Sequence, residues 1–251
     1  MKRFPTILLA LPAILVTNTF ADEAGEKVLR QLDAAARPSA TRSLVRQTIR
    51  TSGGAERAFT LEICTSADEE ELLLVYTEPA RVKGVSFLML NGRSDTWTFN
   101  PKTRRVRKLT SSTQKRRVNG SDFTYEDFGD AGKMGEDYSA DYDGEETLEG
   151  ELCDRIVLVP KPGGPSYSKV IAWVGREPRV VRRADYYDEE GEELKRLIAT
   201  DVRLVDGAPT PHDLLMKSLR GDRSTRMQLV EVERNLEFNG GIFTLDHLQG
   251  R

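Results

Sequence analysis

The chain has 251 residues, a formal net charge of −3 at pH 7, and 31% charged against 38% hydrophobic residues. This length allows one large domain or two small ones. The slight acidic excess argues against a nucleic acid as partner, because such proteins carry a strongly basic surface.

The first 21 residues have the pattern of a secretory signal peptide. Basic residues precede an apolar run over residues 4–20, and small side chains suit cleavage after Ala21. A membrane anchor is the alternative, but the uncharged run has only 17 residues and contains two prolines, which is short for a spanning helix. We therefore expect an exported protein in which residues 1–21 are removed and residues 22–251 form the mature domain.

The pattern changes from helix to strand early in the mature chain. A helix is predicted for residues 23–37, where Val28 and Leu32 share one face and Pro38 ends the run. Residues 43–65 predict a β-hairpin, because two β-prone runs flank a Ser-Gly-Gly turn.

The next two predicted strands, residues 71–79 and 84–92, are apolar on both faces. Within each strand, the residues that share one face are Leu72, Leu74 and Tyr76 in the first and Val85, Phe87 and Met89 in the second. An antiparallel strand with one wet face alternates between apolar and polar residues, so both strands should have apolar neighbours on each side. After a turn at Asn91-Gly92, a further strand places Trp97 and Phe99 on one face.

Strands resume after Gly150. Six are predicted, in residues 153–160, 168–174, 179–188, 194–207, 211–219 and 225–238. In total, ten or eleven strands at a spacing of about 8–14 residues predict a mainly β protein, with a large antiparallel sheet that is curled or closed into a barrel. No linker divides the chain, which favours a single domain. Residues 240–249 are expected to form a short helix or a tail on the sheet.

Residues that could carry out catalysis lack a recognisable motif. His212 and His247 have no ligand-spaced neighbours, and neither a nucleophile motif nor a nucleotide-binding loop is present. Asp122, Glu126 and Asp127 come nearest to an acid/base pair, which would require two carboxyl groups with separated pKa values. We expect a protein that is not an enzyme and that uses no metal or cofactor.

Two cysteines, Cys64 and Cys153, leave two alternatives open. In an oxidising compartment such a pair can form a disulfide across a long loop. The other interpretation is two buried thiols that pack as small apolar groups.

The charges between residues 101 and 151 are divided into two blocks. Eight basic residues and no acid lie between residues 101 and 120, whereas eleven acids lie between residues 126 and 151. Both blocks could be solvated faces, or the basic block could contact an anionic headgroup or an acidic partner. The candidate partner-binding residues are Arg104, Arg105, Arg107, Lys108, Lys115, Arg116 and Arg117.

Residues 118–129, VNGSDFTYEDFG, contain three aromatic and three acidic side chains and fit neither a helix nor a strand. Three interpretations remain open for them: a catalytic loop, a plug that closes a barrel, or a surface loop. The apolar residues of the strands could fill the barrel or line a ligand cavity, which wide barrels tend to enclose. The cavity candidates are Leu72, Leu74, Tyr76, Phe87, Met89, Trp97, Phe99, Phe123, Tyr125, Phe128 and Trp173.

Three segments, residues 81–129, 154–197 and 241–248, closely resemble the periplasmic proteins of the outer-membrane lipoprotein-sorting (LolA-like) superfamily. The likeness is greatest to the longer branch often found beside exporters of the resistance–nodulation–division type, and GSDFTYEDFG is its most specific block. The resemblance implies a half-open barrel of about eleven antiparallel strands with a hydrophobic interior and a helical lid or plug.

The same resemblance implies a function and partners. Sorting carriers of this superfamily hold lipoprotein acyl chains, so we expect a monomeric periplasmic chaperone for a lipid or lipidated cargo. Its partners would be an inner-membrane transporter and an outer-membrane acceptor. The alternative is a regulatory or scaffold protein that senses lipid or docks an exporter. Residues 120–129 would lie at the barrel mouth, where Asp122 and Asp127 would pair with arginines or cap backbone N–H groups.

Overall fold

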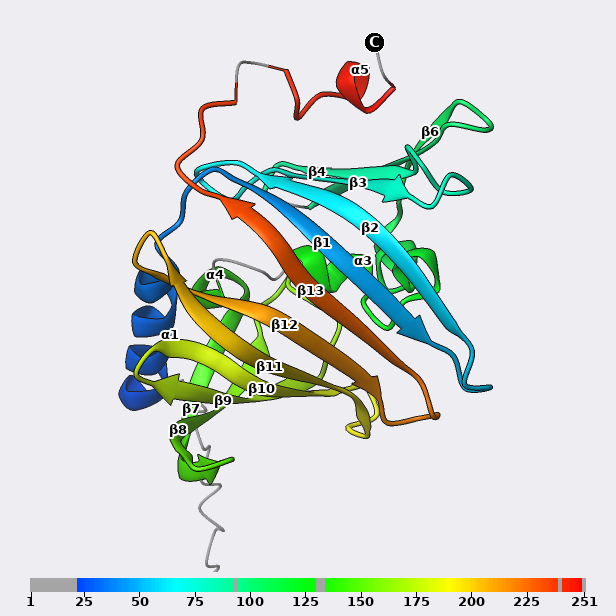
Figure 1. Cartoon of the computed structure of the whole chain (residues 1–251). Helices are drawn as coiled ribbons and strands as arrows, with labels where there is room; N and C mark the ends of the chain where they lie inside the picture. Colours follow the sequence, from blue (N-terminus) through cyan, green and yellow to red (C-terminus); the bar gives the residue numbers. More distant parts are fainter. Residues whose placement is uncertain (1–21, 93, 130–133, 239–240, 250–251) are drawn as a thin grey trace, which may run out of the picture.

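The computed structural model describes residues 22–92, 94–129, 134–238 and 241–249 (Figure 1). The predicted signal peptide, residues 1–21, lies outside the described residues. In the part that is described, no helix has both the length and the apolar character required to cross a membrane.

One antiparallel sheet of thirteen strands forms the body of the protein, in the order β6-β5-β4-β3-β2-β1-β13-β12-β11-β10-β9-β8-β7. The strands are β1 (Thr41–Arg50), β2 (Glu56–Thr65), β3 (Leu72–Glu78), β4 (Ser86–Leu90), β5 (Asp95–Asn100), β6 (Arg105–Lys108), β7 (Tyr138–Leu148), β8 (Glu151–Pro160), β9 (Lys169–Arg176), β10 (Arg179–Tyr187), β11 (Glu193–Val205), β12 (Ala208–Ser218) and β13 (Ser224–Glu233). The helices are α1 (Glu23–Ala36), α2 (Ser111–Gln114), the 3-10 turn η1 (Val118–Gly120), α3 (Tyr125–Gly129), α4 (Met134–Asp137) and α5 (Leu245–Leu248).

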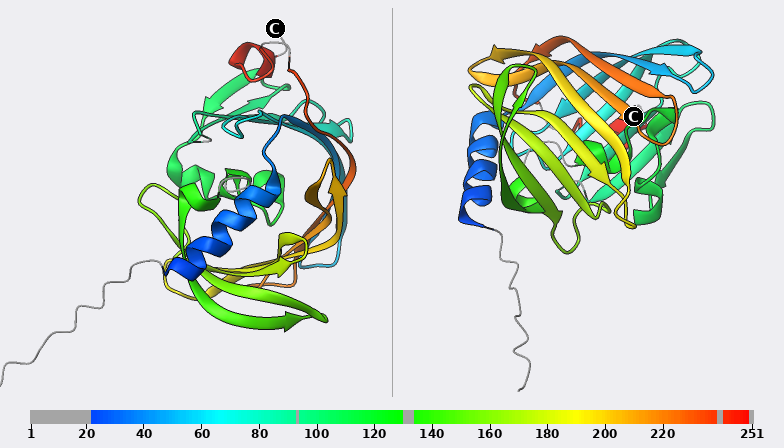
Figure 2. Two further views of the ribbon diagram at one scale, coloured as in Figure 1. Left: turned by 90° about the vertical axis from the view of Figure 1, so that its left-hand side faces the viewer. Right: turned by 90° about the horizontal axis from the view of Figure 1, so that it is seen from below.

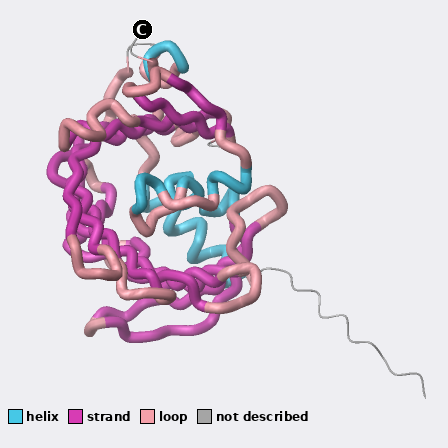
Figure 3. The backbone as a smooth tube through the Cα atoms, turned by 90° about the vertical axis from the view of Figure 1, so that its right-hand side faces the viewer, coloured by secondary structure: helices cyan, strands magenta, loops and turns pink. Residues whose placement is uncertain are grey.

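Nearly every pair of neighbouring strands is joined in sequence, and the exception organises the fold. The first strand, β1, pairs with the last, β13, in the middle of the sheet. The two sheet edges, β6 and β7, are therefore consecutive along the chain. The sheet curls into an open ring, and the helical connection between its two edges lies on the concave side (Figures 2 and 3).

The expected half-open barrel is confirmed, with thirteen strands instead of about eleven. The two strands absent from the sequence prediction are the edges β6 and β7. Both carry charged side chains where a buried strand would carry apolar ones. Charged residues on an edge strand hinder pairing with another chain, and they also remove the alternation by which a strand is recognised.

Helix α1 protects the free edge of β7. Its N-cap, Asp22, accepts the backbone N–H of Tyr142 at 3.0 Å, and Glu26 accepts that of Ala140 at 3.0 Å. A glycine permits this approach, because a Cβ on Gly25 would lie 2.4 Å from the carbonyl oxygen of Ala140. The apolar face of α1 belongs to a buried cluster with residues of β7, β8, β9 and β10, built around Leu29, Tyr138 and Ile156.

Strands β3 and β4 have apolar neighbours on both sides, as predicted. Leu72, Leu74, Tyr76, Phe87 and Met89 face the interior. The alternate residues, such as Leu73 and Leu88, lie in an outer cluster that the C-terminal segment covers with Phe238, Ile242, Phe243, Leu245 and Leu248. The terminal segment therefore forms both a tail on the sheet and a short helix, α5.

The cysteines are free and buried, so the disulfide alternative is wrong. Six strands separate β2, which carries Cys64, from β8, which carries Cys153, and the two thiols lie in different outer clusters. A disulfide requires Cα atoms within about 7 Å. Burial is the largest influence on each thiol, and it raises the pKa of both.

These thiols are expected to react slowly in the folded protein. The thiolate is the reactive form, and burial disfavours it and blocks access. A colorimetric thiol assay should detect fewer than one reactive group per chain at pH 8 in buffer and two in denaturant. Two fast-reacting thiols in the native protein, or none after unfolding without reductant, would contradict the placement of Cys64 and Cys153.

Candidate functional site

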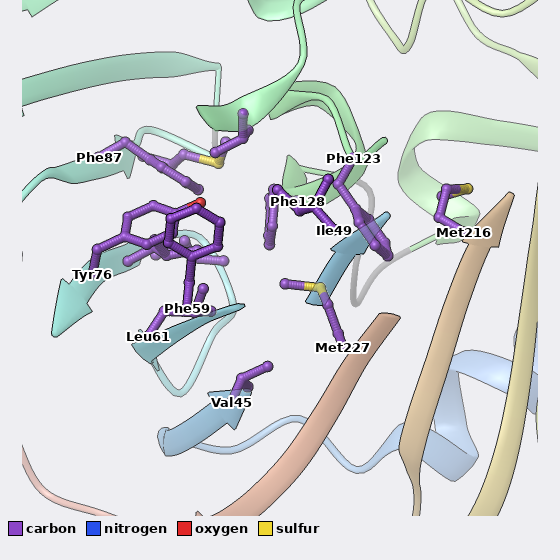
Figure 4. Close-up of a cluster of buried hydrophobic side chains, with 14 residues drawn as sticks. Val45, Ile49, Phe59, Leu61, Tyr76, Phe87, Phe123, Phe128, Met216 and Met227 are labelled. Atoms are coloured by element: carbon purple, nitrogen blue, oxygen red, sulfur yellow. The ribbon is translucent and has the colours of Figure 1, made fainter. Parts of the chain in front are cut away.

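The interior of the curled sheet is a broad apolar cluster (Figure 4). Its buried members from the sheet are Val45, Ile49, Phe59, Leu61, Leu72, Leu74, Tyr76, Phe87, Met89, Met216 and Met227. They come from β1, β2, β3, β4, β12 and β13, so both halves of the chain line it. We refer to this cluster as the interior.

Residues 118–129 insert into the interior and act as a plug. Phe123 and Phe128 are buried, and Tyr125 packs against them. Phe87 of β4 receives the plug, with its ring centroid 5.2 Å from Tyr125 and 5.3 Å from Phe128. Of the three interpretations left open by the sequence, the structure selects the plug.

Asp122 anchors the beginning of the plug. Its carboxylate accepts a hydrogen bond from the Arg223 guanidinium at 3.0 Å and another from the Thr225 hydroxyl at 2.8 Å. Its backbone N–H donates to the same hydroxyl at 2.8 Å. The predicted pairing of Asp122 with an arginine is confirmed, and it ties the plug to β13.

Asp127 anchors the end of the plug. It caps the backbone N–H of Thr124 at 2.6 Å, as predicted, and accepts the Tyr167 hydroxyl at 2.7 Å. It also forms an ion pair with Lys195 of β11, and both side chains are about 95% buried, at 4% and 5% exposure. The Lys195 ammonium lies 5.2 Å from the ring centroids of Tyr167 and Tyr186, which helps to stabilise the buried cation.

The carboxyl groups of the plug do not form a catalytic pair with each other. Asp122 is held by Arg223 and Thr225, whereas Glu126 accepts a hydrogen bond from the Ser166 hydroxyl at 2.8 Å.

Burial, together with the charge of Asp127, raises the pKa of the Tyr167 hydroxyl, which therefore stays protonated as a donor. Within the described ranges, no group of three or more His, Cys, Asp and Glu residues is arranged to hold a metal ion.

Three of the cavity candidates lie on the convex side of the sheet. Trp97 and Phe99 pack in the outer cluster under the C-terminal segment, and Trp173 packs with Cys153 and Ile171 in another outer cluster. Their placement in the interior was therefore wrong, because each lies one position out of phase with an inward-facing neighbour in its strand. The remaining eight candidates belong to or pack against the interior.

Several interior residues were not among the candidates. Val45, Ile49, Phe59 and Leu61 come from the first hairpin, where alternation was visible. Met216 and Met227 lie near the chain's end, and only the pairing of β13 with β1 brings them to this site.

Two pockets lie outside the interior. One of about 370 Å³ lies between the C-terminal segment and the sheet, with Phe238 and Phe243 in its wall. The other, of about 600 Å³, lies beside the end of α1, near Arg37 and Arg179. Neither pocket is lined by residues 118–129.

The basic block lies along the β6 edge and the start of the connection to the plug. All seven candidates are exposed. Lys108 pairs with Asp95 at 2.6 Å and Lys115 with Glu189 at 2.6 Å. The other five form no ion pair with any described residue; they are Arg104, Arg105, Arg107, Arg116 and Arg117.

Residues 68–250 match a family model for uncharacterised proteins. A comparison of the sequence with curated proteins finds no match. Among solved structures, a DUF1329 family protein from Desulfovibrio piger is similar, with 24% identity and a TM-score of 0.82 over 92% of this chain and 100% of that one.

Two further structures share this fold. A LolA superfamily protein from Nitrosomonas europaea is 20% identical, with a TM-score of 0.75 over 89% of this chain and 98% of that one. A domain from Vibrio parahaemolyticus, provisionally assigned to outer-membrane lipoprotein sorting, is 18% identical, with a TM-score of 0.78 over 90% of this chain and 99% of that one. At these identities the likeness shows a LolA-like fold.

Proposed function

The chain belongs to DUF1329, a family of uncharacterised proteins, and has a LolA-like fold. From this premise we propose that it is a non-enzymatic periplasmic carrier. It binds a lipid-like or lipidated cargo, such as lipoprotein acyl chains, in the interior and moves it toward the outer membrane. The provisional assignment of the Vibrio parahaemolyticus domain to lipoprotein sorting supports this cargo class.

The observation that carries the proposal is the plug. The interior is filled by a separate segment, residues 118–129, and not by the strands' side chains alone. Such a segment can withdraw without breaking the sheet, which leaves an apolar chamber. Each buried CH₂ group gains about 0.8 kcal/mol, so an acyl chain of about 12 carbons gains roughly 10 kcal/mol before association costs.

Cargo exchange requires two states with different affinity. The plugged state has a closed interior, and a cargo binds the unplugged state, so cargo shifts the population toward it. Release follows when an acceptor binds the cargo more tightly or when a partner favours return of the plug. The polar anchors of Asp122 and Asp127 set the free-energy difference between these states.

Mass spectrometry on an organic extract of the protein, purified from periplasm without detergent, tests the proposal. A defined lipid or lipopeptide at near one per chain is the expected result. An empty protein that also fails to bind an environment-sensitive apolar dye would instead support a permanently filled barrel.

That outcome would favour the second candidate function, a regulatory or scaffold protein that docks an inner-membrane exporter. The packed interior and the five arginines without ion pairs are the observations on its side. Lipid found in the interior would leave the carrier and the lipid sensor, which transfer assays separate.

Reversing two charges, Arg105→Glu and Arg107→Glu, is expected to slow lipid transfer to anionic vesicles severalfold. These side chains are exposed and form no ion pair within the described chain, so they are available to an anionic headgroup or an acidic partner. Dye binding should stay unchanged, since neither residue lines the interior.

The matched control is Lys27→Glu with Arg30→Glu on α1, which changes the net charge equally at exposed positions. Transfer should be measured with a fluorescent lipid at two salt concentrations, because screening weakens a surface interaction. Equal transfer by both double variants and the unmodified chain would reduce the basic block to a solvated face.

A further inference from the structure

One polar side chain lies in the middle of the apolar interior. Gln47 of β1 is 0% exposed. It is in register with Phe59 of β2 and Met227 of β13, and it shares its strand face with Val45 and Ile49. The neighbouring positions on this face are apolar, so an amide side chain stands out there.

The hydrogen bonding of Gln47 is incomplete. The Tyr76 hydroxyl donates to Gln47 Oε1 at 3.4 Å, while Gln47 Nε2 has no partner in the described part of the chain. The Tyr76 hydroxyl also has a side-chain hydrogen bond with Asn119 of the plug. The amide N–H of Gln47 is therefore an uncommitted donor inside an apolar chamber, which is costly unless something accepts from it.

The unpartnered amide N–H of Gln47 restricts which ligand groups could bind there. An oxygen that accepts and carries no hydrogen of its own fits best, and it must be attached to an apolar group that tolerates the surrounding rings and methyl groups. A carbonyl oxygen of an acyl ester or acyl amide meets both requirements.

Burial raises the pKa of the Tyr76 hydroxyl, so this group stays neutral and able to donate at any physiological pH. The plug residues Val118, Phe123 and Phe128 share the cluster with Tyr76, so the plug shields the pair from water in the closed state.

We propose that Gln47 and Tyr76 form the recognition site for the carbonyl oxygen of an acyl group whose hydrocarbon chain takes the place of the plug. This rests on the proposed carrier function and adds a specificity to it. The interior distinguishes an acylated molecule from a plain hydrocarbon or an ether-linked one of the same length.

Two probes of equal chain length test the site in the full mature chain. They are 1-lauroylglycerol, which has an ester carbonyl, and 1-O-dodecylglycerol, which has an ether and no carbonyl. The chain is expected to bind the ester about three- to tenfold more tightly, the range of one net hydrogen bond in a buried site. Gln47→Leu should abolish that preference by weakening ester binding, with ether binding equal or tighter.

Thr96→Val is the matched control. Thr96 is also fully buried with an unpartnered hydroxyl, and it is in register with Met89, but it lies on β5 beside the β6 edge, whereas Gln47 lies on β1 in the middle of the sheet. This variant should keep the ester-to-ether ratio of the unmodified chain. Gln47→Leu is close in size to the native residue and removes a buried unpaired donor, so the folded state should be retained.

The outcomes separate the two proposals. Equal affinity for ester and ether, or a ratio that Gln47→Leu leaves unchanged, overturns the recognition site while the carrier function stands. Failure of the unmodified chain to bind either probe overturns the carrier function, and the recognition site with it. A third probe, an N-lauroyl dipeptide amide, distinguishes an acylated protein from a lipid ester as the source of the carbonyl.

Discussion

Replacing Lys195 by Met is expected to lower the free energy of unfolding by about 3–5 kcal/mol. The substitution leaves the Asp127 carboxylate about 96% buried and without its cation, at 4% exposure. Removing one partner of a buried pair costs the full desolvation of the other, whereas an exposed pair is worth little. Urea unfolding followed by circular dichroism, with an unchanged denaturant slope, measures the effect.

The double variant Lys195→Met with Asp127→Asn is the informative control. Asparagine keeps an acceptor oxygen for the Thr124 N–H, its Nδ2 can donate to the Tyr167 hydroxyl oxygen, and it carries no charge to desolvate. We expect this variant to recover most of the lost stability. A single variant within about 1 kcal/mol of the unmodified chain would show that the pair is solvated, contrary to its burial.

Truncating Phe128 to Ala is expected to raise the affinity for an apolar dye about tenfold or more. The ring contacts Phe87 at 5.3 Å and Phe123 at 6.0 Å between centroids, so its loss removes much of the plug's hold on the interior. Each 1.4 kcal/mol taken from the closed state increases tenfold the population open to the dye. The loss of stability should be about 3–5 kcal/mol, typical of a buried Phe.

Trp173→Ala provides a control of similar size on the convex face. This side chain is buried at 5% exposure but belongs to an outer cluster. It should destabilise the protein comparably without opening the interior. If both variants increase dye binding equally, general loosening accounts for the effect, and the plug has no gating role.

In the proposed carrier, the plug would allow one molecule to be both stable and open to cargo. An acyl chain would replace its aromatic side chains, whereas its charged anchors to Arg223 and Lys195 have no substitute in a lipid. Cargo would then compete only for the apolar half of the plug's interactions. A partner that binds the basic block would act on the same connection, since that block leads from β6 directly into the plug.

The sequence by itself determined the local features of this protein. The first hairpin, the helix that ends before Pro38 and the two-faced apolar strands β3 and β4 are all confirmed. Each rests on a pattern confined to neighbouring residues: period two in a strand, period 3.6 in a helix, or glycine in a turn. The family resemblance added the half-open closure and the helical plug.

Only the tertiary structure decided which residues meet. Pairing of β1 with β13 brings Met227 against Gln47, and the curl of the sheet brings Lys195 to Asp127, 68 residues away. The same closure turned Trp97 and Trp173 outward and kept Cys64 apart from Cys153. Alternation shows that a strand has two faces, but it does not show which one is concave. That choice depends on the direction in which the whole sheet curls, and no local pattern carries it.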